Sequence, residues 1–267
     1  MNMRKKFGKL VLILISLILV LSACGDKSST EEISENKYNT VENGVLTVGF
    51  CATWPPFEYR DNNGDLVGFD VDLAKEIAKD LGLEIKFCDA DYQGLIPSLQ
   101  KGDYDIVISC LAKSESREET ISFTKKYYNN PSSIIVMKNN NDIKSIEDLA
   151  GKVIGVQYGT ADEMIANSLN TDYNFKELKT YKLPPDEMLD MSQGKIDAVI
   201  VSLAYSLNQV KQSSNFKILD STFGDKEIAA AVNKSNIILL EAVNKSIERI
   251  YEDGTYDKLN DTWLSVK

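Results

Sequence analysis

The segment Lys101–Thr124 reads KGDYDIVISCLAKSESREETISFT. Within it, Asp105–Ser109 is a short apolar run rich in β-branched residues, which predicts a fully buried strand of a parallel sheet. The run opens into a polar loop that carries Arg117, one of only four arginines beside 26 lysines. Open α/β sheets bind ligands at the carboxyl ends of their strands, and arginine binds a carboxylate through two parallel hydrogen bonds. The segment therefore indicates an anion site, although on this stretch alone a solvated run of charges explains Arg117 equally well.

The same pattern returns in the second half of the chain. Gln193–Ile200 reads QGKIDAVI and echoes Lys101–Ile108, KGDYDIVI, while Lys152–Gln157 (KVIGVQ) resembles Val45–Phe50 (VLTVGF). Strand and helix patterns alternate in each half, which favours an α/β architecture. Because a buried parallel strand needs helical cover, we predict two similar lobes, each a mostly parallel sheet flanked by helices. The loops after the two echoing strands would then face each other across a ligand cleft.

Helical periodicity is clear in two places. Apolar residues repeat at helical spacing in FDVDLAKEIAKDLG (69–82), where Asp70 can cap the start and Gly82 can end the helix. The tail, Ile237–Trp263, has the same spacing and an Asp-Gly-Thr break. We expect this tail to return and cover the first lobe.

Two extended apolar runs, Pro131–Lys138 and Glu227–Asn233, lie at the junctions between the halves. We expect them to be the hinge crossings between the lobes. The predicted first lobe then comprises residues 41–130 and 230–267, and the predicted second lobe comprises residues 131–229.

The N-terminus has the features of an export signal. Basic residues precede an apolar run, Leu10–Val20, which is shorter than the roughly 18 residues that a membrane-spanning helix needs. We predict a cleaved signal over residues 1–23, with a signal anchor as the alternative. The sequence LSAC before and at Cys24 resembles the lipobox of bacterial lipoproteins, which implies acylation of Cys24. Polar residues follow, so 24–40 is predicted to be a flexible tether that leaves the protein outside the cytoplasm and lipid-anchored to the cell membrane.

Composition excludes several functions. The net charge of −10 has the wrong sign for nucleic-acid binding, and the absence of histidine removes Ser-His-Asp and Cys-His catalysis. Apart from Cys24, the chain has Cys51, Cys88 and Cys110, an odd number that does not indicate a disulfide framework. All three follow or end predicted strands, so they are either small buried side chains or, by ligand count, a three-thiolate metal site. We expect no cofactor.

Four motifs together resemble one family. They are GFDVDLAKEIA (Gly68–Ala78), the S-x-S-R loop that ends at Arg117 before ISFT, GVQYGT (Gly155–Thr160) and YEDGTYDKLNDTW (Tyr251–Trp263). Over residues 41–267 the chain resembles the extracellular solute-binding proteins of polar amino-acid ABC transporters. The resemblance implies a two-lobed periplasmic-binding-protein-like (type II) fold, acting as a monomer, that closes on one amino acid or related carboxylate and delivers it to the permease.

The resemblance places the family's carboxylate-binding arginine at Arg117. It places contacts from the start of the same loop at Ser109 and Leu111, and contacts from the second lobe at Gln157 and at Gly159 with Thr160. The residues support the last pair independently, because T-A-D-E at 160–163 is a capping box that would begin a helix with its amides toward the cleft. A helix cap with no other role is the alternative for Thr160.

The family's aromatic rings that enclose the ligand side chain fall on Trp54 and Tyr92. Trp54 precedes two prolines in an irregular stretch, and packing in a lobe core is its alternative role. Cys51 stands where relatives often carry an acid near the ligand side chain, which argues against arginine, lysine or histidine as the ligand.

Two positions depart from the family pattern. Ser202 replaces the aspartate that holds the ligand's α-ammonium, and Ala112 replaces a hydroxyl that helps to hold the carboxylate. A buried ammonium without a carboxylate partner would be costly. Either another acid substitutes, with Asp162 the first candidate, or the ligand is not an ordinary α-amino acid.

Two function classes follow. The first is a binding protein without chemistry, which closes on its ligand by a hinge motion. The second is an enzyme resembling cyclohexadienyl dehydratase, which shares the scaffold. Without histidine, its catalytic acid would have to be a carboxyl group such as Glu58 or Asp162. The predicted tether favours the binding protein.

Overall fold

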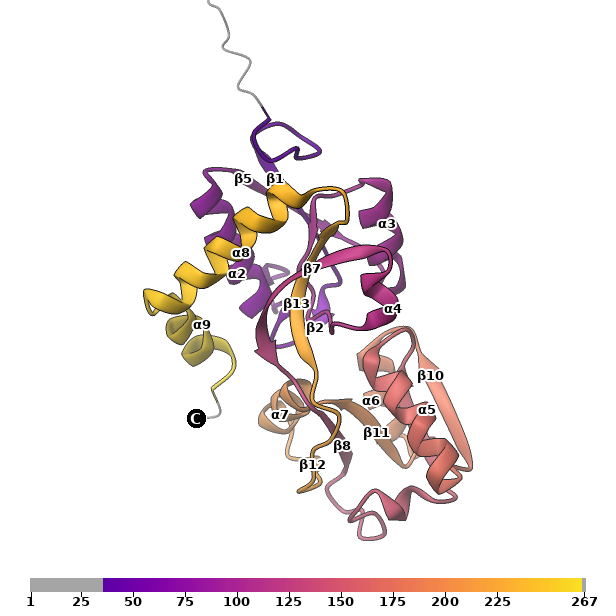
Figure 1. Ribbon diagram of the computed structural model, residues 1–267. Helices are drawn as coiled ribbons and strands as arrows, with labels where there is room; N and C mark the ends of the chain where they lie inside the picture. Colours follow the sequence, from indigo (N-terminus) through magenta and orange to yellow (C-terminus); the bar gives the residue numbers. More distant parts are fainter. Residues whose placement is uncertain (1–35, 266–267) are drawn as a thin grey trace, which may run out of the picture. The chain divides into compact units, whose positions relative to one another are not determined.

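A computed structural model describes residues 36–265 (Figure 1). The predicted signal segment, Cys24 and the predicted tether up to residue 35 lie outside the described residues. Within the described part, no helix combines the length and the apolar character needed to cross a membrane. The last five residues of the predicted tether are ordered here, because Asn236 Nδ2 donates to the carbonyls of Tyr38 and Asn39. The folded part therefore begins earlier than residue 41.

The first sheet has the strand order β5-β1-β6-β13-β7. Its strands are β1 (Val45–Phe50), β5 (Glu84–Asp89), β6 (Ile106–Val107), β7 (Ile121–Asn129) and β13 (Glu227–Asn233). Strand β1 pairs in parallel with β5 and β6, whereas β13 is antiparallel to β6 and β7. The predicted strand at 105–109 is confirmed, although its ladder is shorter than its apolar run.

Helices cover both faces of this sheet. On one side lie α2 (Phe69–Leu81), α8 (Ile237–Glu252) and α9 (Thr255–Trp263), and on the other lies α3 (Leu95–Lys101), preceded by the 3-10 turn η1 (Tyr92–Gly94). In β6, Ile106 packs toward the first group and Val107 toward α3, and both are fully buried. The continuous apolar run of this strand follows from burial on both faces.

The second sheet repeats this plan, with the order β10-β9-β11-β8-β12. Its strands are β8 (Ser132–Met137), β9 (Val153–Gln157), β10 (Glu177–Tyr181), β11 (Ala198–Ser202) and β12 (Phe216–Ile218). The associated helices are η2 (Glu147–Leu149), α5 (Ala161–Tyr173), α6 (Pro184–Ser192) and α7 (Leu203–Gln212). Strand β11 lies beside β9 as β6 lies beside β1, so the predicted echo between the halves is confirmed.

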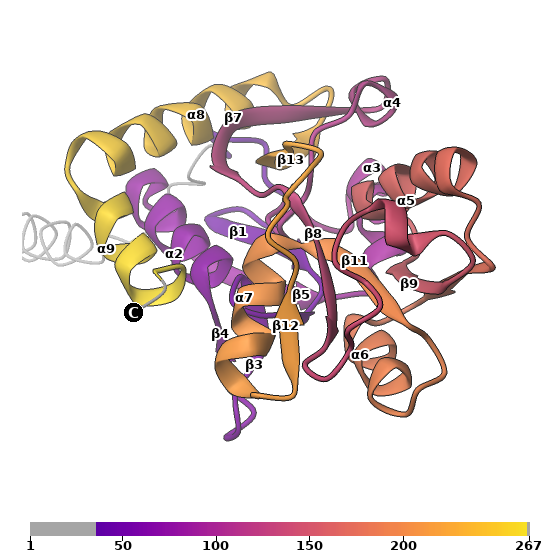
Figure 2. The same ribbon diagram turned by 90° about the horizontal axis from the view of Figure 1, so that it is seen from below.

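Short elements complete the first lobe near the cleft. A small sheet of order β2-β3-β4 is formed by Thr53–Trp54, Glu58–Arg60 and Leu66–Val67, and α4 (Glu115–Glu118) holds the loop of Arg117. In Figure 2, which is seen from below, the second sheet and its helices lie in front of the first sheet.

Two local predictions are wrong. The runs at 131–138 and 227–233 are not hinge crossings, because β8 and β13 are paired strands inside the two sheets. The crossings are the short Asn130–Pro131 link and the segment before β13. Asp70 does not cap α2: the N-cap is Gly68, without a side-chain cap, and the carboxylate of Asp70 is buried.

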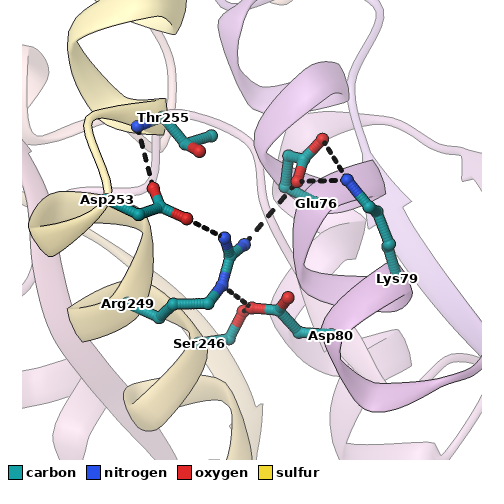
Figure 3. A network of polar contacts seen from close by, with 7 residues as sticks. All are labelled: Glu76, Lys79, Asp80, Ser246, Arg249, Asp253 and Thr255. Carbon is teal, nitrogen blue, oxygen red and sulfur yellow. Dashed lines mark hydrogen bonds and ion pairs between the residues drawn. The ribbon is translucent and has the colours of Figure 1, made fainter.

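The C-terminal helices return to the first lobe as predicted. Ser246 Oγ donates to Asp80 Oδ2 of α2 at 2.6 Å, and Trp263 Nε1 donates to Asp72 Oδ2 at 2.9 Å. Arg249 joins the same network through Asp80, Asp253 and Glu76 (Figure 3). These contacts fix α8 and α9 against α2.

Candidate ligand-binding site

A cavity of about 30 Å³ lies between the two lobes. This volume is far below the roughly 300–1,000 Å³ of small-molecule sites, so a ligand fits only when the lobes are further apart. Nine of the twelve ligand-binding residues predicted from the sequence line it: Cys51, Trp54, Tyr92, Ser109, Ala112, Gln157, Thr160, Asp162 and Ser202. Glu58, Asn130 and Lys226 also line the cavity and were not among the twelve. We call this space the inter-lobe cavity.

The other three predicted residues, Leu111, Arg117 and Gly159, line a neighbouring hollow that shares Tyr92 with the inter-lobe cavity. The guanidinium of Arg117 donates to the carbonyls of Ala112 at 2.6 Å and Gly159 at 3.0 Å. It also lies over the ring of Tyr92. Arg117 thus sits at the mouth of the cavity, where protein carbonyls occupy part of its fork.

The lobes touch at this mouth. Besides the Arg117–Gly159 bond, Gln93 Nε2 donates to the carbonyl of Tyr158 at 3.1 Å, and Lys182 Nζ lies 2.7 Å from Asp91 Oδ2. Each contact joins a residue of the first lobe to one of the second. The conformation is therefore closed, and a ligand can enter only after the lobes separate.

A chain of buried hydrogen bonds supports the first-lobe wall. The amide of Cys51 donates to Ser109 Oγ at 3.1 Å, and that hydroxyl donates to Glu58 Oε1 at 2.8 Å. Ser109 and Glu58 are each 1% exposed. This chain ties the ends of β1 and β6 to β3, so the loops that carry the site have fixed positions.

Asp70 holds the turn beneath the cavity. Its Oδ2 accepts from the amide of Cys110 at 2.5 Å and from the hydroxyl of Tyr127 at 2.9 Å. Cys110 has a φ of 43°, in the left-handed region that side chains disfavour. A buried carboxylate bound to its amide compensates for that backbone conformation.

Glu58 and Asp70 are neighbouring buried acids, and each affects the pKa of the other. Among the described residues, neither Glu58 Oε2 nor Asp70 Oδ1 has a hydrogen-bond partner, and both atoms are buried. We infer that one proton shared between them satisfies both atoms. Burial raises the pKa of Asp70 to about 6. Burial and the charge of Asp70 raise the pKa of Glu58 well above its usual value. The pair therefore carries one negative charge and one proton.

The start of α5 forms the second-lobe wall. Thr160 Oγ1 accepts from the amide of Glu163 at 3.2 Å, as the capping box predicts. Glu163 Oε2, however, accepts from the amide of Gly159 at 2.7 Å and not from that of Thr160. Among the hydrogen bonds of the described residues, none uses the amides of Thr160, Ala161 or Asp162. These three donors lie at a helix N-terminus, where an anion is favoured.

Asp162 forms a buried ion pair with Lys226. Asp162 Oδ1 accepts from Lys226 Nζ and, at 2.5 Å, from Ser132 Oγ. The two charged side chains are 6% and 8% exposed. Nothing in the sequence around Lys226 distinguishes it from the other lysines, because its partner is 64 positions away. The acid proposed from the sequence to hold a ligand ammonium thus already has an internal cation.

Within the described part of the chain, four buried polar atoms of the cavity lining have no hydrogen-bond partner: Trp54 Nε1, Glu58 Oε2, Gln157 Oε1 and Ser202 Oγ. Buried polar groups are normally hydrogen-bonded, so the three atoms outside the Glu58–Asp70 pair indicate a polar ligand. Trp54 also stacks on Tyr205 of α7, with ring centroids 4.9 Å apart. It therefore combines the two roles considered for it, packing in the interior and lining the site.

The three cysteines are not brought together with other metal-ligating side chains. Cys51, Cys88 and Cys110 are free thiols, and no cluster of three metal-ligating side chains occurs among the described residues. Burial raises the pKa of Cys51 and of Cys110. They behave as small, mostly buried side chains.

The fold and the cavity define a ligand-binding protein whose two lobes close over a small solute. Residues 46–266 match the family described as bacterial extracellular solute-binding proteins, family 3. The chain belongs to this family.

Its relatives are described as binding proteins. The chain is 31% identical over 261 residues to the L-cystine-binding protein TcyJ of Escherichia coli (strain K12), covering 97% of this chain and 96% of that protein. An ancestral arginine-binding protein bound to arginine is similar in structure, with a TM-score of 0.79 and 40% identity over 83% of this chain and 99% of that one. The ancestral amino acid-binding protein AncCDT-1, a precursor of cyclohexadienyl dehydratase, has a TM-score of 0.78 and 32% identity over 83% of this chain and 96% of that one.

Proposed function

We propose that this protein captures a small amino acid or related carboxylate outside the cytoplasm and delivers it to the permease of an ABC importer. The observation that carries the proposal is the inter-lobe cavity, which both lobes close and in which buried polar atoms lack partners. Several relatives are described as amino-acid-binding proteins, and one as an ABC transporter arginine-binding protein. A lipid on Cys24 would keep a monomeric protein near its membrane partner.

In this proposal, binding and closure are one event. The open protein offers Arg117 on one lobe and the first amides of α5 on the other, and a carboxylate between them favours closure. The rings of Trp54 and Tyr92 enclose the rest of the ligand. A ligand shifts the lobes toward the closed state only by its preference for that state, and the permease would recognise the closed form.

An enzyme on the same scaffold is the second candidate, and one observation favours it. Glu58 lines the cavity, and its raised pKa would keep a proton available for a general acid. Against it, the other candidate acid, Asp162, is bound to Lys226. The chain also contains no histidine.

One experiment separates the two functions. The purified protein is titrated with amino acids and related carboxylates by calorimetry, and the recovered ligand is analysed by mass spectrometry. We expect saturable binding of one ligand per chain, release of the unchanged ligand and a decrease in the radius of gyration in X-ray scattering. A change in ligand mass would support the dehydratase-like enzyme, and a protein that binds none of these compounds would contradict the proposed function.

A further inference from the structure

Lys226 places a fixed positive charge inside the inter-lobe cavity. A buried ammonium must be paired, and Nζ donates to Asp162 Oδ1 and, at 3.0 Å, to Ser132 Oγ. An ammonium has three N–H donors, so one donor remains after these two bonds. Since Lys226 lines the cavity, this donor is available to a ligand acceptor.

The acidic groups of the cavity lining are already neutralised. Of the described residues that line the cavity, only Glu58 and Asp162 are acidic. Lys226 cancels the charge of Asp162, and the raised pKa of Glu58 keeps its carboxyl group protonated. Asp70 keeps its charge behind Glu58, where Cys110 and Tyr127 donate to it.

The other acid near this ion pair is Glu187 of α6, which is fully buried. Neither of its carboxyl oxygens has a hydrogen-bond partner among the described residues, which strongly disfavours the charged form of this acid. Burial raises its pKa well above the usual value, and the charge of Asp162 raises it further. Glu187 therefore adds no negative charge that could compensate a ligand ammonium.

The remaining acceptors are neutral. Ser202 Oγ and Gln157 Oε1 can accept hydrogen bonds from an ammonium, but neither balances its charge. The donors are more numerous: the fork of Arg117, the three free amides of α5 and the last N–H of Lys226. A zwitterion would bring a positive charge into a cavity whose own lining carries no unpaired anion, because the charge of Asp70 lies behind Glu58 and is already bound by Cys110 and Tyr127. Such burial is costly.

We infer that the preferred ligand carries a net charge of −1, as a dicarboxylic amino acid or as a small carboxylate without an ammonium group, and that Lys226 sets this preference. This inference rests on the proposed function and narrows its ligand class. The net negative charge of the ligand compensates the positive charge of Arg117. An acceptor atom of the ligand takes the third hydrogen bond of Lys226. Basic amino acids, which the arginine-binding relatives take, are disfavoured.

Calorimetry at pH 7 with size-matched pairs tests the inference. The pairs are glutamate with glutamine, aspartate with asparagine, and 2-hydroxybutyrate with 2-aminobutyrate, and arginine and lysine complete the panel. We expect the anion of at least one pair to bind at least tenfold more tightly than its neutral partner and than either cation. Tight binding of glutamate or aspartate would identify the ligand as a dicarboxylic amino acid. Tight binding of 2-hydroxybutyrate would identify it as a small carboxylate without an ammonium group. A neutral or cationic compound that binds most tightly would overturn the inference and leave the proposed function intact, whereas no binding at all would overturn both.

Substitution of the lysine tests its role. Lys226→Met keeps the length of the side chain, removes the ammonium and leaves Asp162 as an unpaired acid. We expect the preference to reverse. The affinity for the best anion should fall at least tenfold, and the affinity for its neutral partner should rise. Lys258→Met, on the exposed surface of α9, changes the net charge equally and should leave the preference as it was. An unchanged preference in folded Lys226→Met would contradict the role of Lys226.

Asp162→Asn provides a second test if Lys226→Met does not fold. It keeps the ammonium and removes the paired charge, so the discrimination against neutral and cationic ligands should increase. A shift of Asp162→Asn toward neutral or cationic ligands would overturn the inference.

Discussion

The same aspartate interaction occurs once in each sheet. Asp105 Oδ2 accepts from the amide of Thr47 at 2.7 Å, and Asp197 Oδ2 accepts from the amide of Val153 at 2.8 Å. Each aspartate comes just before a central strand, and each amide lies on the neighbouring first strand in the equivalent register. The aspartate of the repeated G-x-[YI]-D motif therefore aligns two parallel strands.

Substitution of each aspartate by asparagine measures how much the interaction stabilises each of the two sheets. Asp105 also accepts from Val41 N at 2.6 Å and from Thr47 Oγ1 at 2.5 Å, whereas Asp197 makes one such bond. We expect Asp105→Asn to lower the free energy of unfolding by about 2–3 kcal/mol and Asp197→Asn by about 1 kcal/mol, since charge-assisted bonds contribute about 1.5–3 kcal/mol. Urea denaturation measures both values. Equal losses would contradict the assignment of the additional bonds to Asp105.

The Glu58–Asp70 pair predicts an unusual pH dependence of stability. The ordinary pKa of the aspartate is 3.8, and in the folded protein it is about 6. Between these values the folded state retains a proton that the unfolded chain releases, so stability is full below about pH 4 and falls as the pH rises toward 6. The loss from Asp70 is on the order of 2–3 kcal/mol. Glu58, whose pKa is also raised, extends the decline to higher pH.

Glu58→Gln tests this mechanism. The amide donates permanently to Asp70 and can still accept from Ser109, so it replaces the shared proton. We expect a flatter stability profile between pH 4 and 7, measured by urea denaturation at each pH. Glu84→Gln, on the exposed start of β5, serves as the control and should keep the wild-type slope. A wild-type slope in Glu58→Gln would argue against the shared proton.

At the scale of elements, Arg249 of α8 forms ion pairs with α2 (Figure 3). Its Nε lies 2.5 Å from Asp80 Oδ2, and its side chain is 37% exposed. Because solvent screens the network, we expect Arg249→Leu to lower the free energy of unfolding by only about 1 kcal/mol. The effect should be smaller at high salt. Arg60→Leu removes the more exposed pair with Asp89 and should cost less than about 0.5 kcal/mol. Similar losses in the two variants would show that the helix contact does not depend on this network.

Elements were predictable from the sequence where local pattern decides them. The buried strands, α2 and the C-terminal helices follow from apolar runs and helical spacing. The runs at 131–138 and 227–233 were misassigned because a buried strand and a crossing segment are both extended and apolar. Asp70 was misassigned because an aspartate near a helix start is usually a cap, whereas here Cys110 and Tyr127, distant in sequence, turn its carboxylate inward. The role of Lys226 could not be predicted either, because its partner Asp162 is also distant in sequence.

At the scale of the whole molecule, Arg117 joins the two lobes through its bond to Gly159, and we propose that it holds the ligand carboxylate. We expect Arg117→Ala to weaken ligand binding by roughly a hundredfold or more, because it removes charge-assisted hydrogen bonds together with a contact between the lobes. Calorimetry measures this loss, and X-ray scattering measures closure. Gln93→Ala removes a neutral contact between the lobes and should change affinity by only a fewfold. Near-wild-type affinity in Arg117→Ala would remove the carboxylate clamp from the mechanism.

The position of β13 has a consequence for biosynthesis. This strand lies between β6 and β7, yet it is the last strand of the chain, and the whole second sheet precedes it. A growing polypeptide can therefore complete its second sheet first, while β6 and β7 each present an unpaired edge until residue 233 has been made. Unpaired edges promote aggregation, so the N-terminal half has the greater need of chaperones during synthesis.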